Sequence, residues 1–156
     1  MIYVLDTSSF HVLGNYYPDT FPTFWQQLDT LIHAGRFFSC REVSKELSVQ
    51  NTIEHLTQWI DTNEHLFTAP SAAEMQHVAA IFAVPHFQQL IGQKQRLRGS
   101  PVADPWLVAR ALDVQGCVVT EEGHKPNAAK IPNVCEHFAM PWMSIQAMLK
   151  NEGWRY

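Results

Sequence analysis

The 156-residue chain has no long hydrophobic run, and its apolar stretches fall far short of the ~20 residues that a membrane-spanning helix requires. The N-terminus lacks the basic region and cleavage site of a secretory signal, because the apolar run from Met1 to Leu5 ends at an acid. Cysteine is scarce, and three cysteines cannot all pair within one chain. We therefore expect a cytoplasmic protein without a membrane segment and with three free thiols, Cys40, Cys117 and Cys135.

The chain also lacks an excess of positive charge, since 15 acidic residues outnumber 11 basic ones and give a net charge of −4. Proteins that hold nucleic acid through phosphate contacts usually present a basic surface, and the total charge gives no such sign. An acidic total is compatible with a cluster of carboxylates that holds a divalent cation. Because 46% of the residues are hydrophobic and no repeat, low-complexity tract or linker is present, we expect one globular domain over residues 1–156.

Short apolar segments alternate along the chain with segments of helical periodicity. We expect strands at Met1–Leu5, Phe37–Cys40, Cys117–Thr120 and Met140–Met143. We expect helices from about Pro22 to Gly35, from Arg41 onward, and over residues 51–63, 71–82, 86–97, 103–114, 131–138 and 144–152. This alternation predicts an α/β fold, a three-layer α/β/α sandwich around a central, mostly parallel sheet.

Two helix starts have recognisable capping signals. Ser71 followed by Glu74 is a capping box. Asp104 is expected to cap the helix that continues through Pro105, and Gly116 is expected to end it.

Acidic residues follow the predicted strands at corresponding ends. Asp6 comes directly after the first strand, and Glu121 and Glu122 come after the third. Glu46 lies in the helix after the second strand, and Asp104 at the start of the helix before the third. Because the carboxyl ends of parallel strands open on one edge of the sheet, we expect these acids to share one groove. Taken alone, Asp6 is explained equally well as the cap of the next helix.

Several carboxylates in one groove would repel one another unless a cation were bound. Two carboxylates ~4 Å apart repel by ~4 kcal/mol at an effective dielectric constant of ~20. All-oxygen coordination suits Mg²⁺ or Mn²⁺ rather than zinc. Such a site predicts metal-assisted hydrolysis of a phosphodiester bond.

The succession of MIYVLDTSSF, an acidic helix, ADPWLVARAL and VVTEE resembles the PIN-domain ribonuclease family, which includes the VapC-type toxins of toxin–antitoxin pairs. The resemblance covers nearly the whole chain, and the segments VVTEE and IPNVCEHF resemble another PIN-like branch. It implies a PIN-like sandwich and a Mg²⁺- or Mn²⁺-dependent endoribonuclease that cleaves single-stranded RNA. For a toxin it also implies a protein antitoxin and a homodimer. The matching acids are Asp6, Glu46, Asp104 and Glu122, with Asp6 and Asp104 as direct metal ligands.

For some positions of the predicted site, the sequence leaves more than one candidate residue or role. Glu42 lies one helical turn from Glu46, and Glu121 competes with Glu122, which follows Thr120. Thr7 or Ser8 is a candidate for binding a metal-associated water or a phosphate, although a role in a turn explains them equally well. The basic residues near position 96 are either contacts for the RNA backbone or a solvated charge run: Lys94, Arg96 and Arg98.

Other classes of function compete with the nuclease. The main alternative is a non-catalytic PIN-like module that binds a protein or RNA partner. A structure-specific DNA nuclease would need duplex-binding elements that this chain does not resemble. A zinc site at His124, Cys135 and His137 lacks a full ligand set with zinc spacing.

Overall fold

Four short strands form one parallel sheet in the computed structural model, which describes residues 1–92, 99 and 102–156. The strands are β1 (Tyr3–Leu5), β2 (Phe37–Phe38), β3 (Cys117–Val119) and β4 (Trp142–Met143), and their order in the sheet is β2-β1-β3-β4. Strand β1 pairs in parallel with both neighbours, so that Tyr3 lies opposite Phe37 on one side and Cys117 on the other. All carboxyl ends therefore lie at one edge of the sheet, as the sequence predicts.

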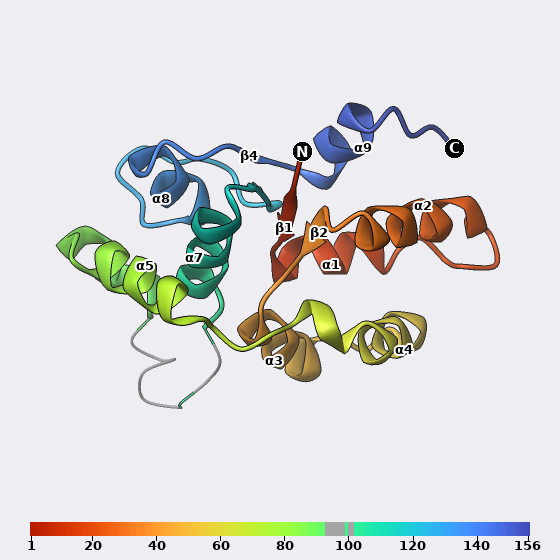
Figure 1. Ribbon diagram of the computed structural model, residues 1–156, viewed down its shortest axis with the longest axis horizontal. Coiled ribbons are helices and arrows are strands. Elements are labelled where there is room, and N and C mark those ends of the chain that lie inside the picture. The colour runs from red at the N-terminus through yellow and green to blue at the C-terminus, as the bar shows by residue number, and fades with distance from the viewer. Residues whose placement is uncertain (93–98, 100–101) are drawn as a thin grey trace.

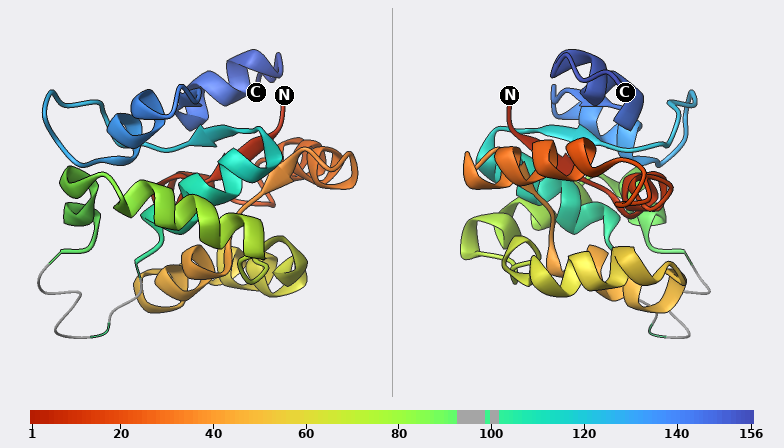
Figure 2. Two further views of the ribbon diagram at one scale, coloured as in Figure 1. Left: turned by 60° about the vertical axis from the view of Figure 1, so that its left-hand side comes forward. Right: turned by 90° about the vertical axis from the view of Figure 1, so that its right-hand side faces the viewer.

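Helices flank the sheet on both sides, and α5 packs against α7 (Figures 1 and 2). The α-helices are α1 (Thr7–Leu13), α2 (Pro22–His33), α3 (Arg41–Gln50), α4 (Glu54–Thr62), α5 (Ala72–Phe82), α7 (Asp104–Val114), α8 (Ile131–His137) and α9 (Ile145–Asn151). Two 3₁₀ segments are η1 (Glu64–Leu66) and η2 (Pro85–Leu90). The predicted α/β class with helices around a parallel sheet is confirmed. Within the described ranges, no helix is long and apolar enough to cross a membrane.

The central strands are buried along their whole length, which explains their unbroken apolar sequences. Every residue of β1 and β3 is at most 1% exposed. A strand covered on both faces has no solvent side, so it does not show the alternation of a half-buried strand. The three cysteines are buried free thiols, as expected, and burial raises the pKa of Cys40 and Cys135 to about 12.

The first strand is tied to the last helix by a polar network. The hydroxyl of Tyr3 donates a hydrogen bond of 2.6 Å to Glu152, and Asn151 donates one of 2.6 Å to the same hydroxyl. Arg36 forms an ion pair of 2.5 Å with Glu152. Burial, followed by the bond to Glu152, raises the pKa of Tyr3 to about 12. The network joins β1 and the segment before β2 to the end of α9.

The helix that carries Asp104 corrects two predictions. Asp104 is the first residue of α7 and not its cap, and Ala103 occupies the cap position. The backbone N–H of Ala103 donates to Glu46, so an acid from α3 satisfies this donor from outside the helix. At the other end, Gln115 and not Gly116 takes the left-handed conformation, with φ of 52°. Gly116 packs closely against β1, since a Cβ there would lie 3.2 Å from a methyl carbon of Val4.

The segment after α5 corrects a third prediction. A 3₁₀ helix, η2, replaces the start of the α-helix expected over residues 86–97, and Pro85 begins it instead of only ending α5. Proline suits the first turn of a helix because its missing N–H has no partner there in any case. Residues 93–97 of that expected helix lie outside the described residues.

Candidate active site

Asp6 directly follows β1 and has two sets of contacts. Its Oδ1 accepts the N–H of Thr7 at 2.7 Å, so it caps α1 as the simpler interpretation predicted. Its Oδ2 accepts hydroxyl bonds from Ser8 at 2.7 Å and Thr120 at 3.0 Å. Asp6 is 4% exposed. The capping bond and the bonds from two separate segments hold this carboxylate in one orientation at the sheet edge.

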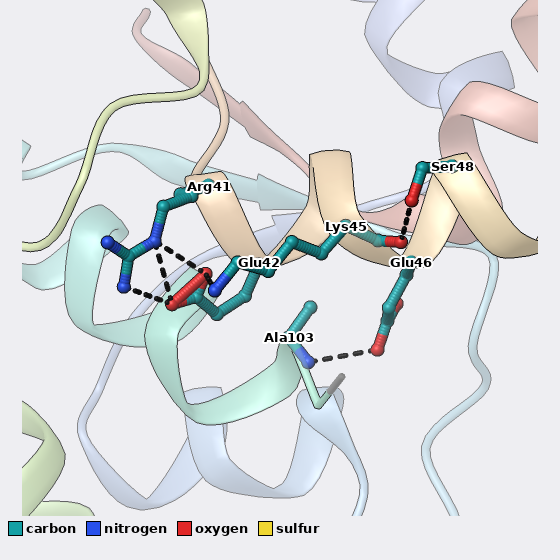
Figure 3. A network of polar contacts seen from close by, with 6 residues as sticks. All are labelled: Arg41, Glu42, Lys45, Glu46, Ser48 and Ala103. Atoms are coloured by element: carbon teal, nitrogen blue, oxygen red, sulfur yellow. Dashed lines mark hydrogen bonds and ion pairs between the residues drawn. The ribbon is translucent and has the colours of Figure 1, made fainter. Parts of the chain in front are cut away.

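Glu46 reaches from α3 to the start of α7, as Figure 3 shows. Its Oε1 accepts the N–H of Ala103 at 2.9 Å, and its Oε2 accepts the hydroxyl of Thr7 at 2.5 Å. These two bonds join α3, α7 and the N-terminal turn of α1. They place the Glu46 carboxylate beside the two elements that begin with Thr7 and Asp104.

The charges of the other three acids affect the pKa of Asp104. The pKa of Asp104 is raised to about 8, chiefly by burial and then by the negative charges of Asp6, Glu122 and Glu46, in that order. The pKa of Glu46 is also raised, chiefly by burial, although its two hydrogen bonds partly oppose this effect. The four acids from separate parts of the chain are therefore close enough to interact electrostatically. We call Asp6, Glu46, Asp104 and Glu122 the acid cluster.

The two glutamates after β3 have different surroundings. The carboxylate of Glu122 accepts the N–H of Ile131 at 3.0 Å and adds to the negative charge at Asp104 and Glu46. The carboxylate of Glu121 instead accepts the N–H of Ile145, at the start of α9, at 2.8 Å. The structure thus brings Glu122 to the other acids, whereas Glu121 is occupied at the start of α9.

Glu42 and Glu46 point in different directions from the same helix, as Figure 3 shows. The carboxylate of Glu42 pairs with Arg41 at 2.9 Å and with Lys45 at 3.9 Å. Glu46, one turn later on the same helix, has no such cation partner among the residues described. The basic residues expected to contact RNA, Lys94, Arg96 and Arg98, lie outside the described residues.

The donor set fits a hard divalent cation in its chemistry, since it consists of carboxylate oxygens. An ionised carboxylate has about four lone-pair sites, so each acid retains acceptor capacity beyond the bonds described above. In the described parts of the chain, however, no three His, Cys, Asp or Glu side chains form a ready-made metal site. Cation binding at the acid cluster would therefore involve movement of these side chains.

One contributor to this site, Ala103, had no sequence signal, and two others, Ser8 and Thr120, were candidates whose bonds to Asp6 were not predicted. Ala103 acts through its backbone N–H, which its residue type does not reveal. Ser8 and Thr120 hold Asp6, and their hydroxyls lie 3.4 Å apart. Small hydroxyl residues next to an acid at a strand end are the available hint, but they occur equally in turns.

Comparison with known proteins establishes the family. The family model described as a domain of unknown function, DUF4411, matches residues 3–156, and the chain belongs to this family. No curated protein matches the chain. Among solved structures, the chain is similar to VapBC2 from Rickettsia felis bound to a DNA fragment from their promoter, with 16% identity and a TM-score of 0.48. That similarity covers 92% of this chain and 98% of the other.

Proposed function

We propose that this protein is a PIN-like endoribonuclease that depends on Mg²⁺ or Mn²⁺ and acts as the toxin of a toxin–antitoxin pair. The observation that carries the proposal is the electrostatic position of Asp104. Burial and three neighbouring acids raise its pKa to about 8, so much of this carboxyl is protonated at neutral pH when no cation is bound. A site that concentrates negative charge in this way is suited to a divalent cation.

In this proposal the four acids have distinct roles. Asp6 and Asp104 bind the cation directly, since both lie at the ends of rigid elements. Glu46 and Glu122 complete the coordination or orient the attacking water. When bound, the cation would polarise the phosphodiester and stabilise the oxygen that leaves.

The residues around the acids supply positioning. The N–H of Thr7 and the hydroxyls of Ser8 and Thr120 fix the Asp6 carboxylate. The hydroxyl of Thr7 also holds Glu46. These bonds limit the rotation of two acids from different elements, which keeps the charges together despite their repulsion.

The test is cleavage of a labelled single-stranded RNA during titration with Mg²⁺ and with Mn²⁺. Asp6→Asn and Asp104→Asn should each reduce cleavage by at least about a hundredfold, the effect of removing one group that stabilises developing charge. Asp113→Asn is the matched control, because Asp113 is an exposed acid on the same helix as Asp104. It should cleave as the wild type does.

The outcomes separate the proposal from its main alternative. Metal-dependent cleavage that is lost in Asp6→Asn and Asp104→Asn supports the nuclease. RNA binding without cleavage at any cation concentration indicates a non-catalytic module instead, consistent with the lack of a ready-made metal site among the described residues. Induced expression in bacteria tests the toxin role, which predicts growth arrest and new RNA ends with the wild type and neither with Asp6→Asn.

A further inference from the structure

A hollow of about 440 Å³, which none of the four acids of the cluster lines, lies between η2 and α8. The segment η2 contributes His86 and Phe87, and α8 contributes Asn133, Glu136 and His137. Its size is within the range of about 300–1,000 Å³ that is typical of small-molecule sites. We call it the α8 pocket. It lies on the side of the molecule where α5, α7 and α8 gather in Figure 1.

Three aromatic rings, from His86, Phe87 and His137, line this pocket. The ring of His137 meets that of Phe87 edge to face, with centroids 5.2 Å apart and planes at 90°. His86 lies 5.9 Å from the same phenyl ring. Phe87 is buried whereas both imidazoles are exposed, so the phenyl ring supports them at the opening. Exposed flat rings of this kind are surfaces on which unpaired bases stack.

One residue that lines the pocket, Asn133, contains a buried hydrogen-bond acceptor. The Nδ2 of Asn133 donates to the carbonyl of Lys125 at 2.8 Å, which fixes the orientation of the amide. The Oδ1 of Asn133 is buried and has no partner within the part of the chain that is described. A buried acceptor without a donor destabilises the folded state, and a hydrogen bond from a ligand N–H would remove this cost. Nucleobases carry such N–H groups on the edges used for base pairing.

Two lysines lie in the loop before α8, and Glu136, which lines the pocket, has a histidine partner. Lys125 and Lys130 are exposed in the loop before α8, and neither lies within 4 Å of a carboxylate among the described residues. Glu136 is held by the imidazole of His124 at 2.6 Å. The His124 ring in turn lies over the exposed Trp142, with centroids 6.3 Å apart and planes at 28°. The surface thus combines aromatic rings with unpaired cations, which suits single-stranded nucleic acid.

We propose that the α8 pocket binds one unpaired nucleobase of a single-stranded RNA. The base stacks against His86 or His137 and donates an N–H to the Oδ1 of Asn133, while the lysines contact the adjacent phosphates. This inference rests on the proposed function for its class of ligand. The acid cluster and the pocket share α8, because the Glu122 carboxylate binds the N–H of Ile131 at the start of this helix. One RNA strand would thereby contact both sites.

Binding without cleavage tests the pocket independently of the nuclease. A fluorescent single-stranded RNA of about eight nucleotides, a common site size, is titrated with protein in EDTA and followed by anisotropy. His137→Ala should weaken binding at least about fivefold, as expected when one stacking partner is removed. His33→Ala is the matched control, since His33 is an exposed histidine on α2, at the opposite side of the molecule in Figure 1.

A second test fills the pocket with a larger side chain and uses a matched control on another surface. Ala128 lines the hollow, so Ala128→Phe should also weaken RNA binding, whereas Ala73→Phe on the exposed surface of α5 should not. Thermal unfolding of each variant checks that it folds. An RNA with one abasic position should bind the wild type more weakly and His137→Ala with little further loss, because the base and the ring act as one pair.

The outcomes distinguish the two proposals. Wild-type RNA binding that falls in His137→Ala and Ala128→Phe but not in the controls supports the pocket, whether or not the RNA is cut. RNA cleavage with unchanged binding in both pocket variants overturns the pocket and leaves the nuclease standing. Absence of RNA binding by the folded wild type in EDTA also overturns it, and the nuclease is then judged on cleavage alone.

Discussion

Carboxylates occur in two contrasting environments in this protein. Glu74 on α5 is 2% exposed and lies 3.2 Å from Arg110 on α7. Glu42 and Glu152 are likewise paired with arginine. In the acid cluster, by contrast, none of the acids has a Lys or Arg within ion-pair distance in the described ranges. Their surroundings are N–H groups, hydroxyls and one another.

The difference shows that concentrated negative charge at the sheet edge does not reflect a shortage of cations. Arg110 and Asp104 lie on the same helix, yet Arg110 is directed to α5 and the acids are left without compensation. An uncompensated cluster costs stability unless protons or a cation bind there. The paired acids should therefore stabilise the fold, and the unpaired acids should limit its stability until a cation binds.

Removing the paired acid Glu74 should give the largest loss of stability. Glu74→Gln removes the counter-charge of Arg110, whose side chain is only 12% exposed, and loss of one partner of a buried ion pair typically costs about 3–5 kcal/mol. Urea unfolding monitored by circular dichroism measures the change. Glu54→Gln, an exposed acid on α4, is the control and should change stability little. Equal stability of the two variants would contradict the inference that the acids paired with arginine stabilise the fold.

The unpaired acid Asp104 should make the metal-free protein less stable as the pH rises. Its pKa of about 8 in the folded state exceeds 3.8, the ordinary value for the unfolded chain, so the folded state binds more protons between these pH values. The free energy of unfolding should therefore fall from near pH 4 to near pH 8. Allowing for solvent screening, we expect a contribution of about 1–3 kcal/mol. Unfolding in EDTA at pH 5 and pH 8 measures it.

The same experiment with Mg²⁺ completes this test. A cation competes with protons for the carboxylates, so Mg²⁺ should raise the unfolding temperature more at pH 8 than at pH 5. Asp104→Asn should be more stable than the wild type at pH 8 without metal and should gain less from Mg²⁺. Asp113→Asn should follow the wild type. If stability depends on pH in the same way in Asp104→Asn and the wild type, Asp104 is not the group responsible for the pH dependence.

The smallest effect on stability is expected for Glu121→Gln, and its comparison with Glu122→Gln distinguishes the roles of the two glutamates after β3. Glu121→Gln weakens the bond to the N–H of Ile145, and loss of such a charged contact at a helix start costs about 1 kcal/mol. It should leave RNA cleavage nearly unchanged. Glu122→Gln should reduce cleavage, because Glu122 contributes charge at Asp104. Comparing cleavage rates of the two variants decides which glutamate serves the site, and the reverse result would assign that role to Glu121.

Much of the fold was predictable because its signals are local. Apolar runs without alternation marked the buried strands, and Ser71 indeed accepts the N–H of Glu74 at the start of α5. The predictions that failed concern residues whose conformation depends on distant partners. Asp104 is the first residue of α7 and not its cap, and the residue at the cap position, Ala103, is held by Glu46 from another helix. Gly116 is fixed by its contact with β1 and not by its own φ angle.

The site was predictable in part for the same reason. A parallel sheet brings together acids that follow its strands, and that rule selected residues from the topology alone. The choice between Glu121 and Glu122 depends on the directions in which two consecutive side chains point, and the spacing of residues in the sequence does not determine these directions. The α8 pocket was not predicted, since His86 and Asn133 meet through tertiary packing and not through a shared motif.

The network around Tyr3 has a practical consequence for work with shortened chains. Deleting the last five residues removes Glu152 and leaves the Tyr3 phenol and the Arg36 guanidinium without their shared acceptor. Asp6 directly follows the last residue of this strand, so we expect loosened packing of β1 to affect the position of Asp6 as well. A purification tag is therefore safer as an extension beyond Tyr156 than as a replacement for these residues.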